Sequence, residues 1–424
     1  MAKPYVTLLG KAVRRIAQMR GGGSALPGLF VEKIDPDFVR RTLAQLPQGV
    51  VIVSGTNGKT TTTKMVVELL ESQGLRVFTN RTGSNFIRGV AAALLGEVDN
   101  KGNLEADIAV LELDEAHAVH FVKAVAPRYS LLLNVMRDQL DRFGEIDTTA
   151  KMLATIATRT TTGVVLNRED PRVSKIARIL KNQKVSYFGL APSLTKLFPS
   201  DDDMRAGKAS EATQQIDADV VLRELHDQDA QFTLGKKTVS VALKLQGVYN
   251  IYNAAAALAL TRAVLGDKID EEKLLDALSN VTPAFGRGES ITIGGQPLEL
   301  VLVKNPSGFR LSLSSFDPED TPTMIAINDN YADGRDMSWL WDVEFDSLRE
   351  EGVSEVSGVR AYDMALRLQY DEITIANVEP DLATALQHFI SSNPDQPKRI
   401  YCTYTAMLAL RRELGKLTDV EVIS

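Results

Sequence analysis

Short apolar runs rich in β-branched residues alternate with longer segments of helical period, such as residues 60–72, through the first half of the chain. The strand-like runs lie at residues 50–53, 76–78, 108–113, 130–135, 164–166 and 185–188. Buried apolar strands that alternate with helices form parallel sheets covered on both faces. The pattern therefore predicts an α/β fold.

The pattern changes near residue 199 and resumes near residue 298. Residues 199–218 are polar without periodicity and predict an exposed insertion, whereas residues 230–245 alternate and predict a pair of antiparallel strands. A helix rich in alanine is expected at 253–264, and glycines and a proline interrupt the pattern between 283 and 297. Further strand-like runs lie at residues 298–303, 324–327, 355–356, 372–376 and 400–403. We expect a helical segment (1–48), a larger α/β domain (49–290) and a smaller C-terminal α/β domain (297–424).

Residues 1–24 predict an amphipathic helix with a basic character. Basic side chains at positions 3, 11, 14, 15 and 20 interleave with apolar residues at helical spacing, and glycines at 21–23 end the helix. Such a helix could pack on the domain that follows it, which we take as the primary expectation. It could also lie on an anionic membrane surface.

The composition is that of an ordinary globular protein, with 44% hydrophobic and 24% charged residues among 424. A formal charge of −7 argues against a large nucleic-acid interface. The single cysteine, Cys402, excludes a disulfide framework or a cysteine-built zinc site within the chain, and its place in a strand-like run favours a core position. No apolar run approaches the roughly 18 residues of a membrane span, and no secretory signal is evident. We expect a soluble, cytoplasmic enzyme.

A glycine-containing loop follows the first strand-like run and opens a helix. After Ser54 it comprises Gly55, Thr56, Asn57, Gly58, Lys59, Thr60 and Thr61. Glycines let backbone amides converge on phosphate oxygens, the helix N-terminus and the lysine add positive charge, and a threonine hydroxyl can ligate Mg²⁺. The two glycines are closer together than in the common phosphate loop. The strand–loop–helix context nevertheless predicts a site for a nucleoside triphosphate.

This shortened loop resembles that of the Mur ligase family, whose members use ATP to activate a carboxylate as an acyl phosphate and then attack it with an amine. A glutamate at the end of a neighbouring strand holds the catalytic magnesium in that family. Glu112 matches this glutamate, with Asp114 and Glu115 as alternatives. The resemblance therefore implies a parallel-sheet ATPase domain that uses ATP and Mg²⁺, with Thr60 and Glu112 on the metal.

Three further positions match the family in the same order along the chain. Asn167 lies in a segment that resembles its Asn-x-Asp-Asp-Pro stretch, and Asn253 matches an asparagine that contacts adenine. Arg287 matches an arginine that reaches the ATP phosphates from the domain boundary. The resemblance implies that all three bind ATP.

The C-terminal domain resembles the MurT-type synthetase subunits of this family. The match is carried by residues 328–336 and 338–342, and by residues 79–90 earlier in the chain. It implies ATP-dependent amidation of the α-carboxylate of D-glutamate in the lipid II stem peptide, which gives D-isoglutamine. Ammonia would come from a separate GatD-type glutaminase subunit in a heterodimer, and contact with the membrane-held substrate would be peripheral. Many members carry a four-cysteine zinc ribbon where residues 199–218 stand, so we expect no zinc here.

The resemblance assigns catalytic roles to Lys59, which would stabilise the transferred phosphoryl group, and to Asp336. An aspartate can fix the tautomer of a histidine and stabilise its cation. The resemblance implies that Asp336 does so for the catalytic histidine of the glutaminase, with Asp342 as the alternative. The C-terminal domain would thus bind the partner.

Trp339 and Trp341 are the two tryptophans of the chain. Because they alternate in a short stretch, we expect both on one face, in the core or at a partner interface.

Two other functions stay open at this point. A Mur-type amino-acid ligase, such as a folylpolyglutamate synthase, would use an amino acid as the nucleophile and need no glutaminase. A regulatory subunit would bind nucleotide without turnover, although the matches at Lys59, Glu112 and Arg287 argue against it.

Overall fold

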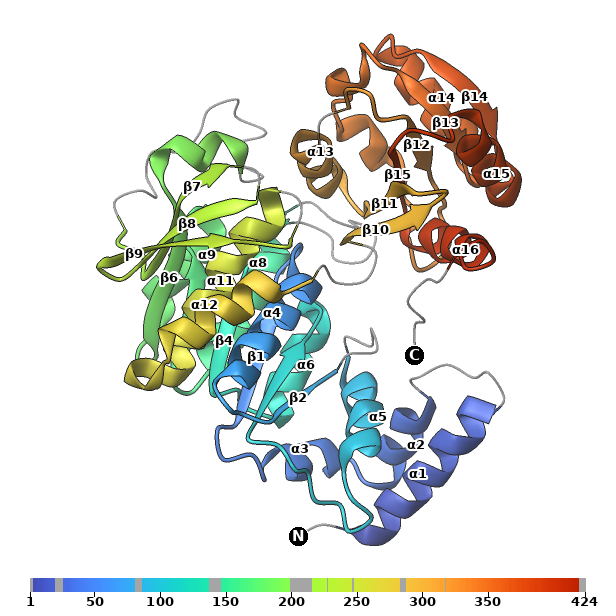
Figure 1. The fold of residues 1–424 in the computed structure, drawn as a ribbon. Helices are drawn as coiled ribbons and strands as arrows, with labels where there is room; N and C mark the ends of the chain where they lie inside the picture. Colours follow the sequence, from blue (N-terminus) through green and yellow to red (C-terminus); the bar gives the residue numbers. More distant parts are fainter. Residues whose placement is uncertain are drawn as a thin grey trace. The chain divides into compact units, whose positions relative to one another are not determined.

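In the computed structural model, the described residues are 3–19, 26–80, 86–136, 146–198, 216–226, 228–245, 248–282, 287–316 and 318–418. They form two compact units. One takes most of the chain up to Val281, and the other takes the residues from Thr282 on, together with Met136, Leu245 and residues 248–249. Each unit is built on its own sheet, shown in Figure 1.

The first sheet has the strand order β2-β3-β1-β4-β5-β6-β7-β8-β9 among the described residues. Its strands are β1 (Val50–Ser54), β2 (Val77–Thr79), β3 (Ile108–Glu112), β4 (Tyr129–Leu132), β5 (Gly163–Asn167), β6 (Lys184–Leu190), β7 (Val220–His226), β8 (Asp229–Leu234) and β9 (Lys237–Ala242). The pairs from β2 to β7 are parallel, which confirms the predicted sheet. The predicted strand pair corresponds to β8 and β9, and the preceding β7 extends it to an antiparallel meander.

Helices accompany this sheet in the expected alternation. They are α1 (Pro4–Met19), α2 (Leu26–Ile34), α3 (Phe38–Leu43), α4 (Lys59–Ser72), α5 (Ile87–Glu97), α6 (Glu115–Ala124), α8 (Ile146–Arg159), α9 (Pro171–Ser174), α11 (Val248–Leu265) and α12 (Glu271–Asn280), with short 3₁₀ turns η1 (Lys175–Ile179), η2 (Pro192–Leu197) and η4 (Gly266–Lys268). All residues of β1 and β3 are buried. The alanine-rich α11 is buried from Ile251 to Thr261, because its small side chains let neighbouring elements approach closely. The expected polar insertion at 199–218 lies outside the described residues, apart from its last three.

The second sheet has the order β10-β11-β15-β12-β13-β14, with β10 antiparallel to β11 and the other pairs parallel. Its strands are β10 (Arg287–Ile293), β11 (Gln296–Leu302), β12 (Thr323–Ala326), β13 (Val353–Ser357), β14 (Ile375–Glu379) and β15 (Lys398–Cys402). The helices are α13 (Pro306–Ser315), α14 (Ala361–Tyr370), α15 (Leu382–Ser392) and α16 (Tyr404–Leu414), with 3₁₀ turns η5 (Ser338–Asp342) and η6 (Asp346–Leu348).

The expected domain limit at residue 290 falls inside β10, which pairs with β11 in the second sheet. Gly294 and Gly295, both with positive φ, close the hairpin between β10 and β11 within the stretch where glycines interrupt the sequence pattern. Cys402 is fully buried in β15, as predicted, and burial raises the pKa of its thiol. Of the helices in the described ranges, none is both long and apolar enough to cross a bilayer.

Candidate functional site

The phosphate loop begins where β1 ends, between β3 and β4 in the sheet. Gly55 has φ +137° and Gly58 has φ +86°, a backbone region that favours glycine. A Cβ atom on Gly58 would lie 2.6 Å from Asn253 Oδ1, and one on Gly55 would lie 2.9 Å from the Asn134 backbone nitrogen. Both glycines are therefore required by conformation and by close packing.

Asn134, two residues beyond β4, fastens the loop by backbone and side chain. Its carbonyl oxygen accepts a hydrogen bond from the Thr56 backbone nitrogen at 3.0 Å. Its Oδ1 accepts from the Asn57 nitrogen at 2.8 Å, and its Nδ2 donates to the Asn57 carbonyl at 3.0 Å. Sequence reasoning gave Asn134 no role, although its position after a buried strand was a usable signal.

Lys59 is the first residue of α4 and lies largely buried against the loop. Its Nζ donates to the carbonyl oxygens of Gly55 at 2.5 Å and Thr56 at 3.1 Å. The same ammonium lies 3.6 Å from Glu115 Oε2, whose side chain is buried. Glu115, an alternative magnesium ligand by sequence, is thus the ion-pair partner of Lys59. The other alternative, Asp114, caps α6 by accepting from the Ala116 nitrogen.

The structure brings Thr60 and Glu112, the two predicted magnesium ligands, into contact. Thr60 Oγ1 donates to Glu112 Oε1 at 2.8 Å. Adjacent ligands of an octahedral Mg²⁺, each at about 2.0–2.1 Å, lie about 2.9 Å apart. The spacing and the hard oxygen donors therefore fit Mg²⁺.

Asn80, directly after β2, holds the magnesium-site glutamate in place from the neighbouring strand. Its Nδ2 donates to the Glu112 carbonyl at 2.8 Å, and its Oδ1 accepts from the Glu112 nitrogen at 3.0 Å. This amide clamp is buried. Because it depends on β2 lying beside β3, the sequence alone did not reveal it.

Asn253 on α11 has only 4% of its surface exposed and lies against Gly58. Within the part of the chain that the structure describes, its Nδ2 atom is buried without a hydrogen-bond partner. A buried amide donor without a partner is costly, so such groups often serve a ligand. The orphaned donor beside the phosphate loop fits a nucleotide acceptor.

Asn167 at the end of β5 is engaged within the protein. Its Nδ2 donates to the Leu133 carbonyl at 2.8 Å, and its Oδ1 accepts from Tyr252 Oη at 2.6 Å. Asp170 caps α9 and also accepts from the Val135 nitrogen at 2.6 Å. Burial raises the pKa of Asp170 to about 6. These contacts join the ends of β4 and β5 to α9 and α11.

Two predicted ATP-binding residues remain, Thr61 in the loop and Arg287 at the domain boundary. Thr61 is buried in the first turn of α4. Arg287 opens β10, and its side chain lies outside what the structure describes.

In the second unit, Asp336 is exposed just before η5. Its Oδ1 accepts from the Ser338 backbone nitrogen at 2.9 Å, and hydrogen bonds from Ser338 lower the pKa of the carboxyl group. The nearby Asp333, which sequence reasoning passed over, is 6% exposed. It accepts from the backbone nitrogens of Thr405 at 2.8 Å and Asn330 at 3.1 Å, and burial raises its pKa. Asp333 thus ties this loop to α16.

The two tryptophans do not share a face, so that expectation is wrong. Trp339 is buried and its ring meets Phe309 at 6.4 Å, whereas Trp341 is 51% exposed. The segment is a 3₁₀ helix with about three residues per turn, so side chains two apart point in different directions.

Trp341 belongs to an exposed apolar surface on the second unit. Its ring packs edge-on against Tyr370 at 5.6 Å. Tyr362, Leu366 and Tyr370 follow one another at intervals of four along α14, with 70%, 58% and 75% of their surface exposed. We call these four residues, Trp341, Tyr362, Leu366 and Tyr370, the aromatic face. Exposed aromatic side chains gathered in this way are typical of a protein-binding surface.

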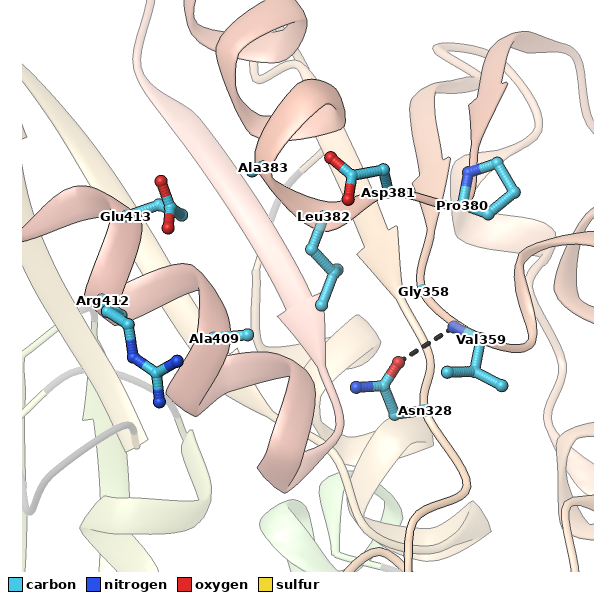
Figure 2. A pocket seen from close by; sticks show the side chains of 10 residues that line it. All are labelled: Asn328, Gly358, Val359, Pro380, Asp381, Leu382, Ala383, Ala409, Arg412 and Glu413. Atoms are coloured by element: carbon cyan, nitrogen blue, oxygen red, sulfur yellow. Dashed lines mark hydrogen bonds between the residues drawn. The ribbon is translucent and has the colours of Figure 1, made fainter.

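The second unit also holds a cavity of about 320 Å³ near the ends of β12, β13 and β14 (Figure 2). Asn328 accepts from the Val359 nitrogen at 2.9 Å on one side of it. The lining also includes Leu382 of α15, the N-cap Asp381 of that helix, and Arg412 of α16. Its lining includes neither Asp336 nor a phosphate-loop residue.

Comparison with known families and structures defines the class. The Mur ligase middle domain model matches residues 53–261, and the MurT ligase C-terminal model matches residues 302–407. The chain is similar in fold to MurF of Acinetobacter baumannii (TM-score 0.69, 20% identity, 93% of this chain and 80% of that one). It is also similar to MurF of Thermotoga maritima in complex with ADP (TM-score 0.67, 18% identity, 91% and 85%). With its phosphate loop, the chain is a nucleotide-binding ligase of the Mur type.

Curated relatives narrow this class further. The chain is 31% identical to "Lipid II isoglutaminyl synthase (glutamine-hydrolyzing) subunit MurT" of Streptococcus pneumoniae, over 96% of both chains. It is 29% identical to the protein of the same name from Staphylococcus aureus, over 87% of both. The chain belongs to the MurT family.

Proposed function

We propose that this chain is the synthetase subunit of a lipid II isoglutaminyl synthase. It uses ATP to activate the α-carboxylate of D-glutamate in the stem peptide of lipid II, and ammonia then converts that carboxylate to the amide of D-isoglutamine. The observation that carries the proposal is the Thr60–Glu112 pair beside Lys59 at the phosphate loop. Membership of the MurT family supplies the reaction and substrate.

The first half of the reaction rests on residues of the first unit. The terminal phosphoryl group passes from ATP to a carboxylate oxygen, which gives ADP and an acyl phosphate. Lys59 and the loop amides would bind and orient the phosphates and offset their charge. Thr60 and Glu112 would hold Mg²⁺, which supplies further charge neutralisation on phosphate oxygens when bound. The Asn253 amide and Arg287 would add contacts to the nucleotide.

In the second half, ammonia attacks the acyl phosphate, so a C–N bond forms as the C–O bond to phosphate breaks. A partner subunit is proposed as the ammonia source, since the relatives are named as subunits of a glutamine-hydrolyzing synthase. The aromatic face offers a docking surface for this GatD-type glutaminase. Trp341 of that face lies in η5, five residues after Asp336 in the sequence. This proximity favours a role for Asp336 beside the partner's catalytic histidine.

Substitutions at Lys59 and Asp336 test the two halves separately. With the purified complex, ATP and lipid II, Asp336→Asn should abolish amidation from glutamine and retain amidation from ammonia at high pH. Lys59→Met should abolish both, with ADP release measured alongside product. Asp342→Asn is the matched control in the same segment and should behave as the wild type.

Equal loss with both nitrogen sources would move Asp336 to the synthetase site. Selective loss in Asp342→Asn would assign the role to Asp342.

The fold also resembles a folylpolyglutamate synthase of Mycobacterium tuberculosis (TM-score 0.62, 18% identity, 91% of this chain and 96% of that one). Product from ATP and a free amino acid without any partner would favour that class and refute the proposal.

A further inference from the structure

Helix α1 carries an apolar stripe that its own unit does not cover. Tyr5, Leu8, Leu9, Ile16 and Met19 have 58%, 51%, 49%, 52% and 87% of their surface exposed. At about 100° of rotation per residue they fall within an arc of about 100° on the helix, together with Ala12. They therefore form one continuous strip along α1. We call these six residues the α1 stripe.

The opposite face of α1 already provides the packing that holds the helix in place. Val6 and Ala17 are buried there, and α1 packs on α2 and α5. Gly10 lets the helices approach closely, because a Cβ atom at this position would lie 2.7 Å from side-chain atoms of Leu95 and Val31. The α1 stripe is therefore additional to the core-facing side of the helix.

Helix α1 itself carries basic residues and no acidic residue. Residues 1–31 contain five basic and no acidic residues, in a chain whose formal charge is −7. Lys11 and Arg15 border the stripe on the side of Leu8, and Arg15 is exposed. A helix with an exposed apolar strip and lysine or arginine along its border matches the pattern of helices that lie in the plane of an anionic membrane surface.

We propose that α1 docks on the surface of an anionic lipid bilayer, with the α1 stripe between the acyl chains and Lys11 and Arg15 at the headgroups. The charge distribution argues against a second copy of this chain as the occupant, because a two-fold contact would bring two helices of the same positive charge together. The proposal is independent of the reaction proposed above, since lipid binding can be measured without turnover.

Vesicle co-sedimentation of the full chain tests the proposal. Binding is compared on phosphatidylcholine vesicles with and without phosphatidylglycerol. The wild type should bind the anionic vesicles preferentially, and binding should weaken as salt screens the headgroups. Leu9→Gln combined with Ile16→Gln should lower the partition coefficient at least tenfold, since both side chains leave the acyl region. Lys11→Gln combined with Arg15→Gln should lower it roughly 25-fold, at about fivefold for each charge.

Ile179→Gln in η1 is the matched control, because Ile179 is an apolar side chain of the same unit with 51% of its surface exposed and belongs to no proposed binding surface. It should change vesicle binding by less than twofold. Circular dichroism and nucleotide binding verify that each variant is folded. If the Leu9→Gln, Ile16→Gln variant fails to fold, the Lys11→Gln, Arg15→Gln variant still decides the test. Failure of the wild type to bind anionic vesicles, or wild-type binding by both α1 variants, overturns the proposal. It is likewise overturned if the α1 variants dissociate a homodimer, or lose the partner subunit, while vesicle binding stays unchanged.

Discussion

Replacing Asn253 with leucine separates a ligand-binding role of this side chain from a structural one. In the wild type its Nδ2 is buried without a partner in the described residues, beside Gly58 of the phosphate loop. A buried donor left unpaired costs about 1–3 kcal/mol. Removing it should therefore leave the free energy of unfolding of the nucleotide-free protein unchanged or raise it by about 1 kcal/mol, as measured in urea.

Nucleotide binding should respond in the opposite direction. One lost hydrogen bond to the ligand is worth about 1–1.5 kcal/mol, so Kd for ATP should rise about tenfold in calorimetric titrations. At a nucleotide concentration of 100 times the wild-type Kd, the wild type gains about 2.7 kcal/mol of stability and the variant about 1.4 kcal/mol.

Thr261→Val is the matched control on the same helix. Thr261 is fully buried and its Oγ1 also lacks a partner in the described residues, but it lies two turns further along α11. This variant should gain stability and keep the wild-type Kd. The reasoning is refuted if Asn253→Leu loses more than about 1 kcal/mol without nucleotide and binds ATP normally, because the amide would then be structural.

Three other substitutions address the phosphate loop, the buried carboxyl group and the partner surface. Gly58→Ala places a Cβ atom at φ +86° and 2.6 Å from Asn253 Oδ1. The variant should therefore destabilise the fold by about 1–3 kcal/mol and weaken ATP binding. Unchanged ATP binding in titrations would contradict the loop geometry. The pKa of Asp170 is about 6 in the folded protein against 3.8 for the free group. Protonation of Asp170 therefore stabilises the folded state at low pH, and this stabilisation is lost as the pH rises through 6. The difference in unfolding free energy between wild type and Asp170→Asn should therefore shrink by roughly 1–2 kcal/mol from pH 5 to pH 8, and a constant difference would argue against the raised pKa. Tyr362→Ala on the aromatic face should alter stability by less than about 0.5 kcal/mol and weaken association with the glutaminase about tenfold or more in sedimentation assays; wild-type association would place the interface elsewhere.

The central strands and the phosphate loop were predictable because their signals are local. β1 and β3 are continuous β-branched and aliphatic runs, and the loop combines glycine, lysine and threonine in sequence. The resemblance to the Mur ligase family implied Thr60 and Glu112 as ligands of one metal, and the contact between them agrees with the rule that the ends of neighbouring parallel strands meet. By contrast, the Asn80 clamp on Glu112 requires that β2 lie beside β3, and sequence order does not specify this adjacency.

One expectation failed because a single local signal supports two structures. The spacing of Trp339 and Trp341 places them on one face of a strand but on different faces of a 3₁₀ helix. Secondary-structure propensities discriminate poorly over a segment of five residues. The packing of Trp339 on Phe309 therefore decides between a strand and a 3₁₀ helix.

The two aspartates of the Asp-Gly-Arg-Asp segment differ in the property that a histidine-orienting group needs. Such a group must be ionised and must reach the imidazole. Burial raises the pKa of Asp333, and its oxygens accept from the backbone of Thr405 and Asn330. Asp336 is exposed, and hydrogen bonds from Ser338 lower its pKa, so it carries its charge at the surface. The electrostatics therefore favour Asp336 as the group offered to a partner and Asp333 as the residue that positions the loop.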